Sequence, residues 1–280
     1  MRSPEPPGVQ AMVKQGVTAA RRGKWNEAVR WFDEALARTP PLTPAQRSIT
    51  LHHRGLAKAR LRQLDGAVED FSHAIQINDE FGLAYIDRGV ARAQRGEFRR
   101  ALVDLSKGLA LVPDQLCGLV ARGLVHFELG ALENALADLT AAQQLAVNDA
   151  DIYFHRGKVQ LTRANYSAAA ADFEDSVRLS PHHPRYHNQL AWFCSTCPDE
   201  RHRNAAKAVT HAATACELSG WSDYVILDTL AAALAASGEF VHAIEKLELA
   251  LALAPETERA LLRRHLDALH TRKPYHEMPP

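Results

Sequence analysis

The chain has 280 residues, of which 46% are hydrophobic and 24% are charged. This composition is typical of a folded protein and excludes an intrinsically disordered chain. Lys and Arg together number 33, as do Asp and Glu, so no net charge attracts nucleic acid or an anionic membrane. No run of about 18 apolar residues predicts membrane insertion, and the start MRSPEPPGVQ lacks the apolar core of a signal peptide. We therefore expect a cytoplasmic protein.

A repeat with a period of 34 residues runs through the chain. Arg-Gly recurs at Arg54, Arg88, Arg122 and Arg156, and each copy is followed by an alanine and then by Phe or Leu at fixed distances. Within each copy the apolar spacing is helical, with a break marked by glycine in several copies. Each copy is therefore expected to be a hairpin of two helices, which must stack on its neighbours because it cannot bury its apolar side alone.

Fainter copies extend the repeat in both directions. We expect seven units, at about residues 9–42, 48–81, 82–115, 116–149, 150–183, 184–222 and 224–257. The segment 1–8 is expected to be a flexible N-terminus, 258–272 a capping helix with leucines on one side and arginines on another, and 273–280 a C-terminal tail.

The period and the order of glycine, alanine, large apolar residue, alanine and proline resemble the tetratricopeptide repeat (TPR). The resemblance implies an all-α fold, a right-handed α-α solenoid of about seven TPR hairpins plus a C-terminal capping helix. It also implies a role in binding proteins or peptides. The segments LAWFCSTCPDERHRNAAKAV…ACEL and LDTLAAALAASGEF resemble a bacterial variant unit that ends such arrays, often in multidomain regulatory proteins. Cys194 departs from this variant, where an apolar residue is more usual.

Two insertions interrupt the period. In residues 41–47, Thr43, Pro44 and Gln46 have the spacing of a capping box with proline at the first helical position, which predicts a lengthened helix. In the sixth unit about five residues are added between the helices, where Pro198 ends the first helix and Asn204 is expected to cap the second.

An arginine and an aspartate occur together, sixteen residues apart, in the second to fifth units and are both missing elsewhere. If each arginine paired with the aspartate of the preceding unit, Arg54 and Asp172 would have no partner. We therefore expect each arginine to pair with the aspartate of its own hairpin. Duplication without contact is the alternative. The predicted ladder consists of Arg54 with Asp70, Arg88 with Asp104, Arg122 with Asp138, and Arg156 with Asp172.

The first helices of TPR-like hairpins line the concave side of the solenoid. In the third to fifth units, the positions of these helices that face away from the hairpin are largely apolar. This pattern favours a groove that binds an apolar or amphipathic segment of a partner. The alternative is that these side chains pack on neighbouring helices. The candidate groove residues are Leu83, Ile86, Val90, Val120, Leu124, Phe127, Phe154 and Lys158.

A carboxylate clamp, known from other TPR proteins, is not expected. The corresponding places hold Val13, Val17, His53, Leu83 and Asp87 instead of the lysine, asparagine and arginine that hold a terminal carboxylate.

Motifs for catalysis or phosphate binding are missing from the sequence: it has no Gly-rich phosphate loop, no H-E-x-x-H and no G-x-S-x-G. We therefore expect no enzyme and no cofactor, but an interaction scaffold or adaptor. The alternatives are a regulatory repeat region that acts with a separate catalytic domain, such as a signalling kinase, and a self-association module that forms homo-oligomers.

Cys194 and Cys197 form a C-x-x-C pair, and Cys216 follows on the next helix. We interpret them as structural thiols without a bound metal, since a thiol on an inward-facing helix behaves as a small apolar side chain. A zinc site with a nearby histidine, or a redox pair, are the alternatives. The redox alternative lacks the strand that precedes such a motif in thioredoxin-like folds.

Overall fold

The computed structural model describes residues 8–274, and within them it contains fifteen α-helices, one short 3-10 helix and no strand. The predicted all-α solenoid of stacked hairpins is confirmed. Of the predicted flexible segments, residues 1–7 and 275–280 lie outside the described residues. In the described part, no helix combines the length and the apolar character needed to cross a bilayer.

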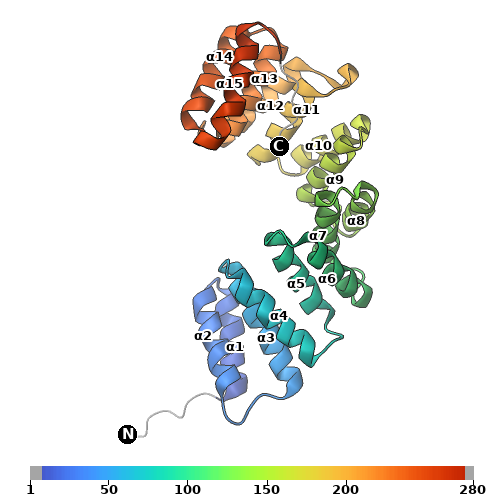
Figure 1. Ribbon diagram of the computed structural model, residues 1–280, viewed down its shortest axis with the longest axis vertical. Helices are drawn as coiled ribbons and strands as arrows, with labels where there is room; N and C mark the ends of the chain where they lie inside the picture. The colour runs from blue at the N-terminus through green and yellow to red at the C-terminus, as the bar shows by residue number, and fades with distance from the viewer. Residues whose placement is uncertain (1–7, 275–280) are drawn as a thin grey trace. The chain divides into compact units, whose positions relative to one another are not determined.

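The chain divides into two compact units, Met1–Leu145 and Ala146–Pro280. In unit 1 each odd-numbered helix pairs with the next helix to form a hairpin, and each hairpin packs on the following one (Figure 1). Its helices are α1 (Val9–Arg21), α2 (Trp25–Ala37), α3 (Pro44–Arg60), α4 (Leu64–Ile77), α5 (Gly82–Gln94), α6 (Phe98–Leu111), α7 (Leu116–Glu128) and α8 (Leu132–Leu145).

Unit 2 continues with three hairpins and a last helix that packs on α14 (Figure 1). The predicted capping helix at 258–272 corresponds to α15. The elements are α9 (Ala150–Thr162), α10 (Tyr166–Leu179), α11 (Pro184–Thr196), the 3-10 helix η1 (Glu200–His202), α12 (Ala205–Leu218), α13 (Tyr224–Ala236), α14 (Phe240–Leu253) and α15 (Glu256–His270).

Close contact between the two helices of a hairpin depends on the repeat glycine. A Cβ atom on Gly157 would lie 2.7 Å from the ring of Phe173, closer than van der Waals contact allows. Phe173 itself is completely buried. Because the glycine of α9 has no side chain, it leaves room for the aromatic ring of α10. The same packing occurs in two other hairpins, between Gly16 and Phe32 and between Gly55 and Phe71.

Both insertions take the predicted local structure. The Thr43 side chain accepts a hydrogen bond from the Gln46 amide and the Gln46 side chain accepts one from the Thr43 amide, so the capping box is confirmed and α3 has 17 residues. The Asn204 side chain caps α12 by accepting a hydrogen bond from the Lys207 amide. Before it, the guanidinium of Arg203 donates to the carbonyl of Cys197 over 2.6 Å, which holds the added turn against the end of α11.

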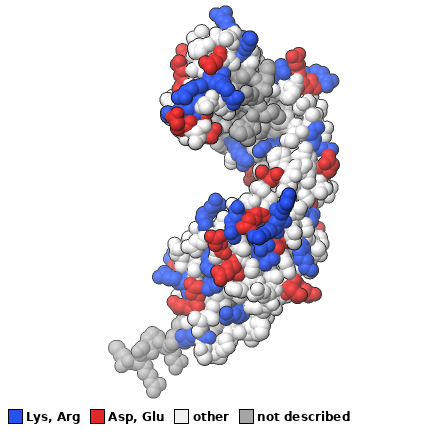
Figure 2. Space-filling model, viewed as in Figure 1, with Lys and Arg blue, Asp and Glu red and all other residues white. Residues whose placement is uncertain are grey.

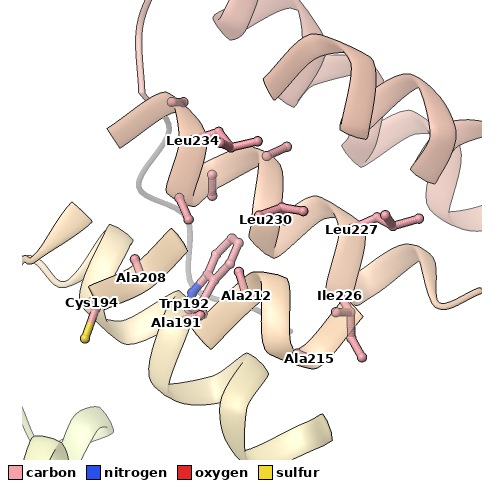
Figure 3. Packing of buried hydrophobic residues seen from close by; sticks show 14 of the residues in the cluster. Ala191, Trp192, Cys194, Ala208, Ala212, Ala215, Ile226, Leu227, Leu230 and Leu234 are labelled. Carbon is pink, nitrogen blue, oxygen red and sulfur yellow. The ribbon is translucent and has the colours of Figure 1, made fainter. Parts of the chain in front are cut away.

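The core of unit 2 is dominated by small residues. Ala191, Ala208, Ala212 and Ala215 are fully buried where α11, α12 and α13 meet, which lets the three helices approach closely. The indole of Trp192 projects from α11 into this cluster (Figure 3).

Candidate binding surface

Each arginine of the predicted ladder binds the aspartate of its own hairpin through two hydrogen bonds. In Arg122 and Asp138 these bonds are 2.8 Å and 2.7 Å long, and in Arg156 and Asp172 they are 3.0 Å and 2.6 Å. The pairs Arg54 with Asp70 and Arg88 with Asp104 have the same geometry. All four aspartates are buried, so the bidentate pairs satisfy carboxylates that lie between the two helices.

A second cation, missed by sequence reasoning, reaches two of the aspartates. The ammonium of Lys58 lies 2.8 Å from Asp70, and the guanidinium of Arg92 lies 2.7 Å from Asp104. Both residues follow the ladder arginine by four places, one helical turn, which is a spacing that could have predicted them. The fifth unit holds Gln160 at this place, so Arg156 is the only cation within salt-bridge distance of Asp172 among the described residues.

The outer face of the first helices in unit 1 carries a row of apolar side chains. Each member directly follows a repeat glycine, and all four are only half-buried. Because α1, α3, α5 and α7 are consecutive neighbours, the four positions form one line across the unit. We call this line the apolar row, and it consists of Val17, Leu56, Val90 and Leu124.

A pocket of about 310 Å³ lies at the N-terminal end of the apolar row. Val17 and Leu56 of the row line it together with Trp25 and Arg60. The guanidinium of Arg60 lies 5.9 Å from the centre of the Trp25 ring. The pocket thus combines apolar walls with a cationic rim, and it was not predicted because Trp25 comes from the second helix of its hairpin.

Figure 2 shows Lys and Arg interspersed with Asp and Glu on the visible face of each unit. That distribution agrees with the equal numbers of the two kinds of charge in the sequence.

The prediction that they line a groove is wrong for two residues, Ile86 and Phe154, because both are buried. Ile86 is completely buried, because it fills the space beside Gly108 and Gly118, where added Cβ atoms would lie 2.5 Å and 3.1 Å from its side chain. Phe154 is 2% exposed and packs between the rings of Phe173 and Tyr186. Both side chains therefore belong to the core.

The other predicted groove residues differ in exposure. Leu83 is 37% exposed on α5, while Val90, Val120, Leu124 and Phe127 are half-buried. Lys158 is half-buried on α9 and belongs to unit 2, so it is no part of the unit 1 surface.

Neither a family model nor a curated protein sequence matches this chain. Solved structures do match. The "APC/C hetero-tetramer Cut9-Hcn1" aligns with a TM-score of 0.70 and 17% identity over 95% of this chain and 50% of that chain. A tetratricopeptide repeat protein from Parabacteroides merdae aligns with a TM-score of 0.62 and 15% identity over 94% and 98% of the two chains.

The chain has the TPR fold. YrrB, described as "a TPR protein with an unusual peptide-binding site", aligns with a TM-score of 0.55 and 19% identity over 71% of this chain and 100% of that one. At these identities the likeness shows the fold, and the binding properties of each protein remain its own.

The sixth unit has Leu190 in place of the ladder arginine, and its two helices are joined instead by a contact between two histidines. His211 occupies the place of the ladder aspartate, and its Nδ1 lies 3.0 Å from Nδ1 of His187. Burial and the neighbouring His187 lower the pKa of His211. Nε2 of His187 lies 2.9 Å from the Pro181 carbonyl and donates a hydrogen bond to it, which leaves Nδ1 of His187 facing His211.

All three cysteines of this unit, Cys194, Cys197 and Cys216, are buried. Burial raises the pKa of Cys194 and of Cys216 to about 11, so both thiols are protonated at neutral pH. Within the part of the chain that the structure describes, no three His, Cys, Asp or Glu side chains are grouped as a metal would require. It is the burial of Cys194, Cys197 and Cys216 in the apolar cluster of unit 2 that favours their interpretation as structural thiols.

A polar cluster occupies the first-helix face at the start of unit 2. The Tyr186 hydroxyl donates to Asp151 over 2.8 Å, and burial followed by this bond raises the pKa of Tyr186. Burial, and next the neighbouring Arg185, lower the pKa of His155 to about 4. His155 is therefore neutral in the native TPR array at physiological pH.

Replacing His155 with Gln should remove part of the acid sensitivity of unit 2. In the unfolded chain His155 takes up a proton near pH 6.5, whereas in the folded chain it does so only near pH 4, so native stability falls as pH falls between these values. We expect the free energy of unfolding of the wild type to drop by about 2 kcal/mol more than that of the variant from pH 7 to pH 4.5. Urea denaturation at both pH values measures this, and equal drops would contradict it.

Proposed function

We propose that this chain is a cytoplasmic, non-enzymatic scaffold that holds an apolar or amphipathic segment of another protein on the first-helix face of unit 1. The observation that carries the proposal is the apolar row: four half-buried apolar side chains at one repeat place, on four neighbouring helices. Such a line of apolar side chains on a solvent-facing surface is a common feature of interaction sites.

The spacing of the row limits what can bind. Neighbouring helices lie about 8–10 Å apart, so successive side chains of the row are separated by a similar distance. A peptide in the polyproline II conformation advances about 3.1 Å per residue with three residues per turn, so every third side chain points to the same side and reaches successive places of the row. We infer a ligand with apolar residues at intervals of about three.

The pocket at the end of the row supplies an anchor. Its volume of about 310 Å³ accommodates one large side chain, which would lie against Val17, Leu56 and Trp25. The cationic Arg60 at its rim favours a carboxylate next to this anchor residue.

The double variant Val90→Asp/Leu124→Asp tests the proposal. It places two charges in the middle of the row, and the affinity for peptides selected from a random display library should fall by about 100-fold or more, since charges would have to be desolvated on binding. Calorimetric titration measures the affinity. Unchanged affinity would contradict the proposal.

Val103→Asp is the matched control. Val103 is 69% exposed on α6, away from the row, so this variant should keep the wild-type affinity. Circular dichroism of the double variant must show wild-type helix content, since loss of helix would mean that Val90 and Leu124 belong to the core. Light scattering before the titration separates peptide binding from association of the chain with itself through the same row.

A further inference from the structure

A second pocket of unit 1 lies between α2, α3 and α4. Its volume is about 400 Å³, and small-molecule sites usually have about 300–1,000 Å³. On α3 it is lined by three residues that share one side of the helix, Arg47, Leu51 and Arg54. Leu56 of the apolar row comes nine residues after Arg47, about two and a half turns, and so lies on the opposite side of α3. We call this space the insertion pocket.

Comparison of the repeats shows which group the insertion pocket lacks. In the third unit Tyr85 occupies the place of Leu51, and its ring centre lies 5.5 Å from the guanidinium of the ladder arginine Arg88. In the fifth unit Tyr153 lies 5.4 Å from its ladder arginine in the same way. Such distances are those of a cation–π contact. Because Leu51 has no ring, the corresponding space beside Arg54 is left for a ligand.

The insertion at residues 41–47 adds a charged group to this space. α3 has 17 residues and α7 has 13, so α7 lacks the added first turn, although it too has a leucine, Leu119, at the place of Leu51. The added turn brings Arg47 beside the end of α2, where its guanidinium donates to the Leu36 carbonyl over 3.4 Å. Within the described part of the chain, Arg47 has no carboxylate partner. Its charge is therefore available to a ligand.

The chemistry of the lining fits an aromatic acid. Each guanidinium nitrogen of Arg54 donates to Asp70 or Asp33, so the part left for a ligand is the flat face. Arg47 supplies an unbalanced charge, and none of the described lining residues is Asp or Glu. The other lining residues are apolar or can donate a hydrogen bond, namely Leu36, Ile77, His73 and Gln76. A ring suits the face of Arg54, and a carboxylate suits Arg47.

We propose that the insertion pocket binds a small aromatic carboxylate, with its ring on Leu51 beside Arg54 and its carboxylate at Arg47. The ring takes the place that tyrosine fills in the third and fifth units. This site is independent of the function proposed above, because the apolar row lies on the opposite side of α3.

The probe is 3-phenylpropionate, titrated into the full chain and followed by saturation-transfer NMR. We expect a dissociation constant of about 1 mM or lower. 3-Phenylpropionamide, which lacks the charge, and butyrate, which lacks the ring, should bind at least about tenfold more weakly.

Three variants locate the probe. Leu51→Tyr should abolish binding with unchanged helix content, because the new ring fills the pocket as Tyr85 fills its place in α5. Arg47→Gln should weaken binding of the acid about tenfold and leave binding of the amide unchanged. Arg100→Gln is the matched control, since Arg100 is 75% exposed on α6, and it should keep the wild-type affinity.

The absence of saturation transfer to 3-phenylpropionate would overturn the proposal, as would wild-type affinity in a folded Leu51→Tyr. If Leu51→Tyr lost helix content, Arg47→Gln would decide, and an unchanged affinity for the acid would overturn the proposal. The peptide acetyl-Gly-Gly-Phe carries the same two groups, and binding of this peptide without binding of the free acid would contradict a small-molecule site. Val90→Asp/Leu124→Asp should keep the wild-type affinity for the probe. Loss of probe binding in that variant would place the probe on the apolar row and also overturn the proposal.

Discussion

The variant Arg156→Met is expected to lower the free energy of unfolding of unit 2 by about 3 kcal/mol or more. The reason is the buried partner. The side chain of Asp172 is 5% exposed, and Arg156 is the only cation within salt-bridge distance of it among the described residues. Methionine keeps much of the packing volume of arginine but leaves the carboxylate inside the hairpin without a counter-charge. Urea denaturation followed by tryptophan fluorescence measures the change.

Two further variants separate the loss of charge from the loss of packing. Arg88→Met removes the equivalent arginine, but Asp104 keeps its bond to Arg92, so we expect a loss of only about 1 kcal/mol. The double variant Arg156→Met/Asp172→Asn should recover most of the stability, because no unpaired charge remains. If Arg156→Met and Arg88→Met lowered the free energy of unfolding equally, Arg92 would not compensate the charge of Asp104, and this explanation would be contradicted.

The variant Phe173→Ala is expected to lower the free energy of unfolding by about 3–5 kcal/mol. Phe173 is completely buried, fills the space above Gly157 and lies 5.7 Å from the ring of Phe193 on α11. Alanine would leave a cavity that joins three helices, and the glycine opposite cannot fill it. Denaturation with urea at constant pH measures the loss.

Phe173→Leu is the control for this position. The repeat places leucine opposite the glycine in other hairpins, at Leu105 and Leu139, so leucine fits this environment. We expect a loss of less than about 2 kcal/mol. If both variants lost the same stability, the ring of Phe173 would not be the side chain that holds α9, α10 and α11 together.

The sequence predicts the hairpins and the ladder because both depend on spacing within one repeat. Arg122 and Asp138 lie on the two helices of one hairpin, and internal comparison of the units was enough to indicate their contact. The additional cations Lys58 and Arg92 have an equally regular spacing, yet they contact carboxylates whose burial is visible only in the packed structure.

The groove was less predictable because it depends on contacts between hairpins. Ile86 has the spacing of an outward side chain, but Gly108 and Gly118 open a space that it fills. Phe154 is covered by Tyr186 of the next hairpin in the same way. The apolar row is simpler, since its four members share the place after the repeat glycine, and Val17 and Leu56 could have been added to Val90 and Leu124 by the same comparison.

Hydrogen–deuterium exchange with and without a selected peptide tests the binding surface most directly. The proposed function predicts slower exchange in α1, α3, α5 and α7, which carry the apolar row, and unchanged exchange in α2, α4, α6 and α8 away from the pocket. The protection should disappear in Val90→Asp/Leu124→Asp and persist in Val103→Asp. Protection centred on the second helices, or confined to unit 2, would contradict the assignment of the partner to the first-helix face of unit 1.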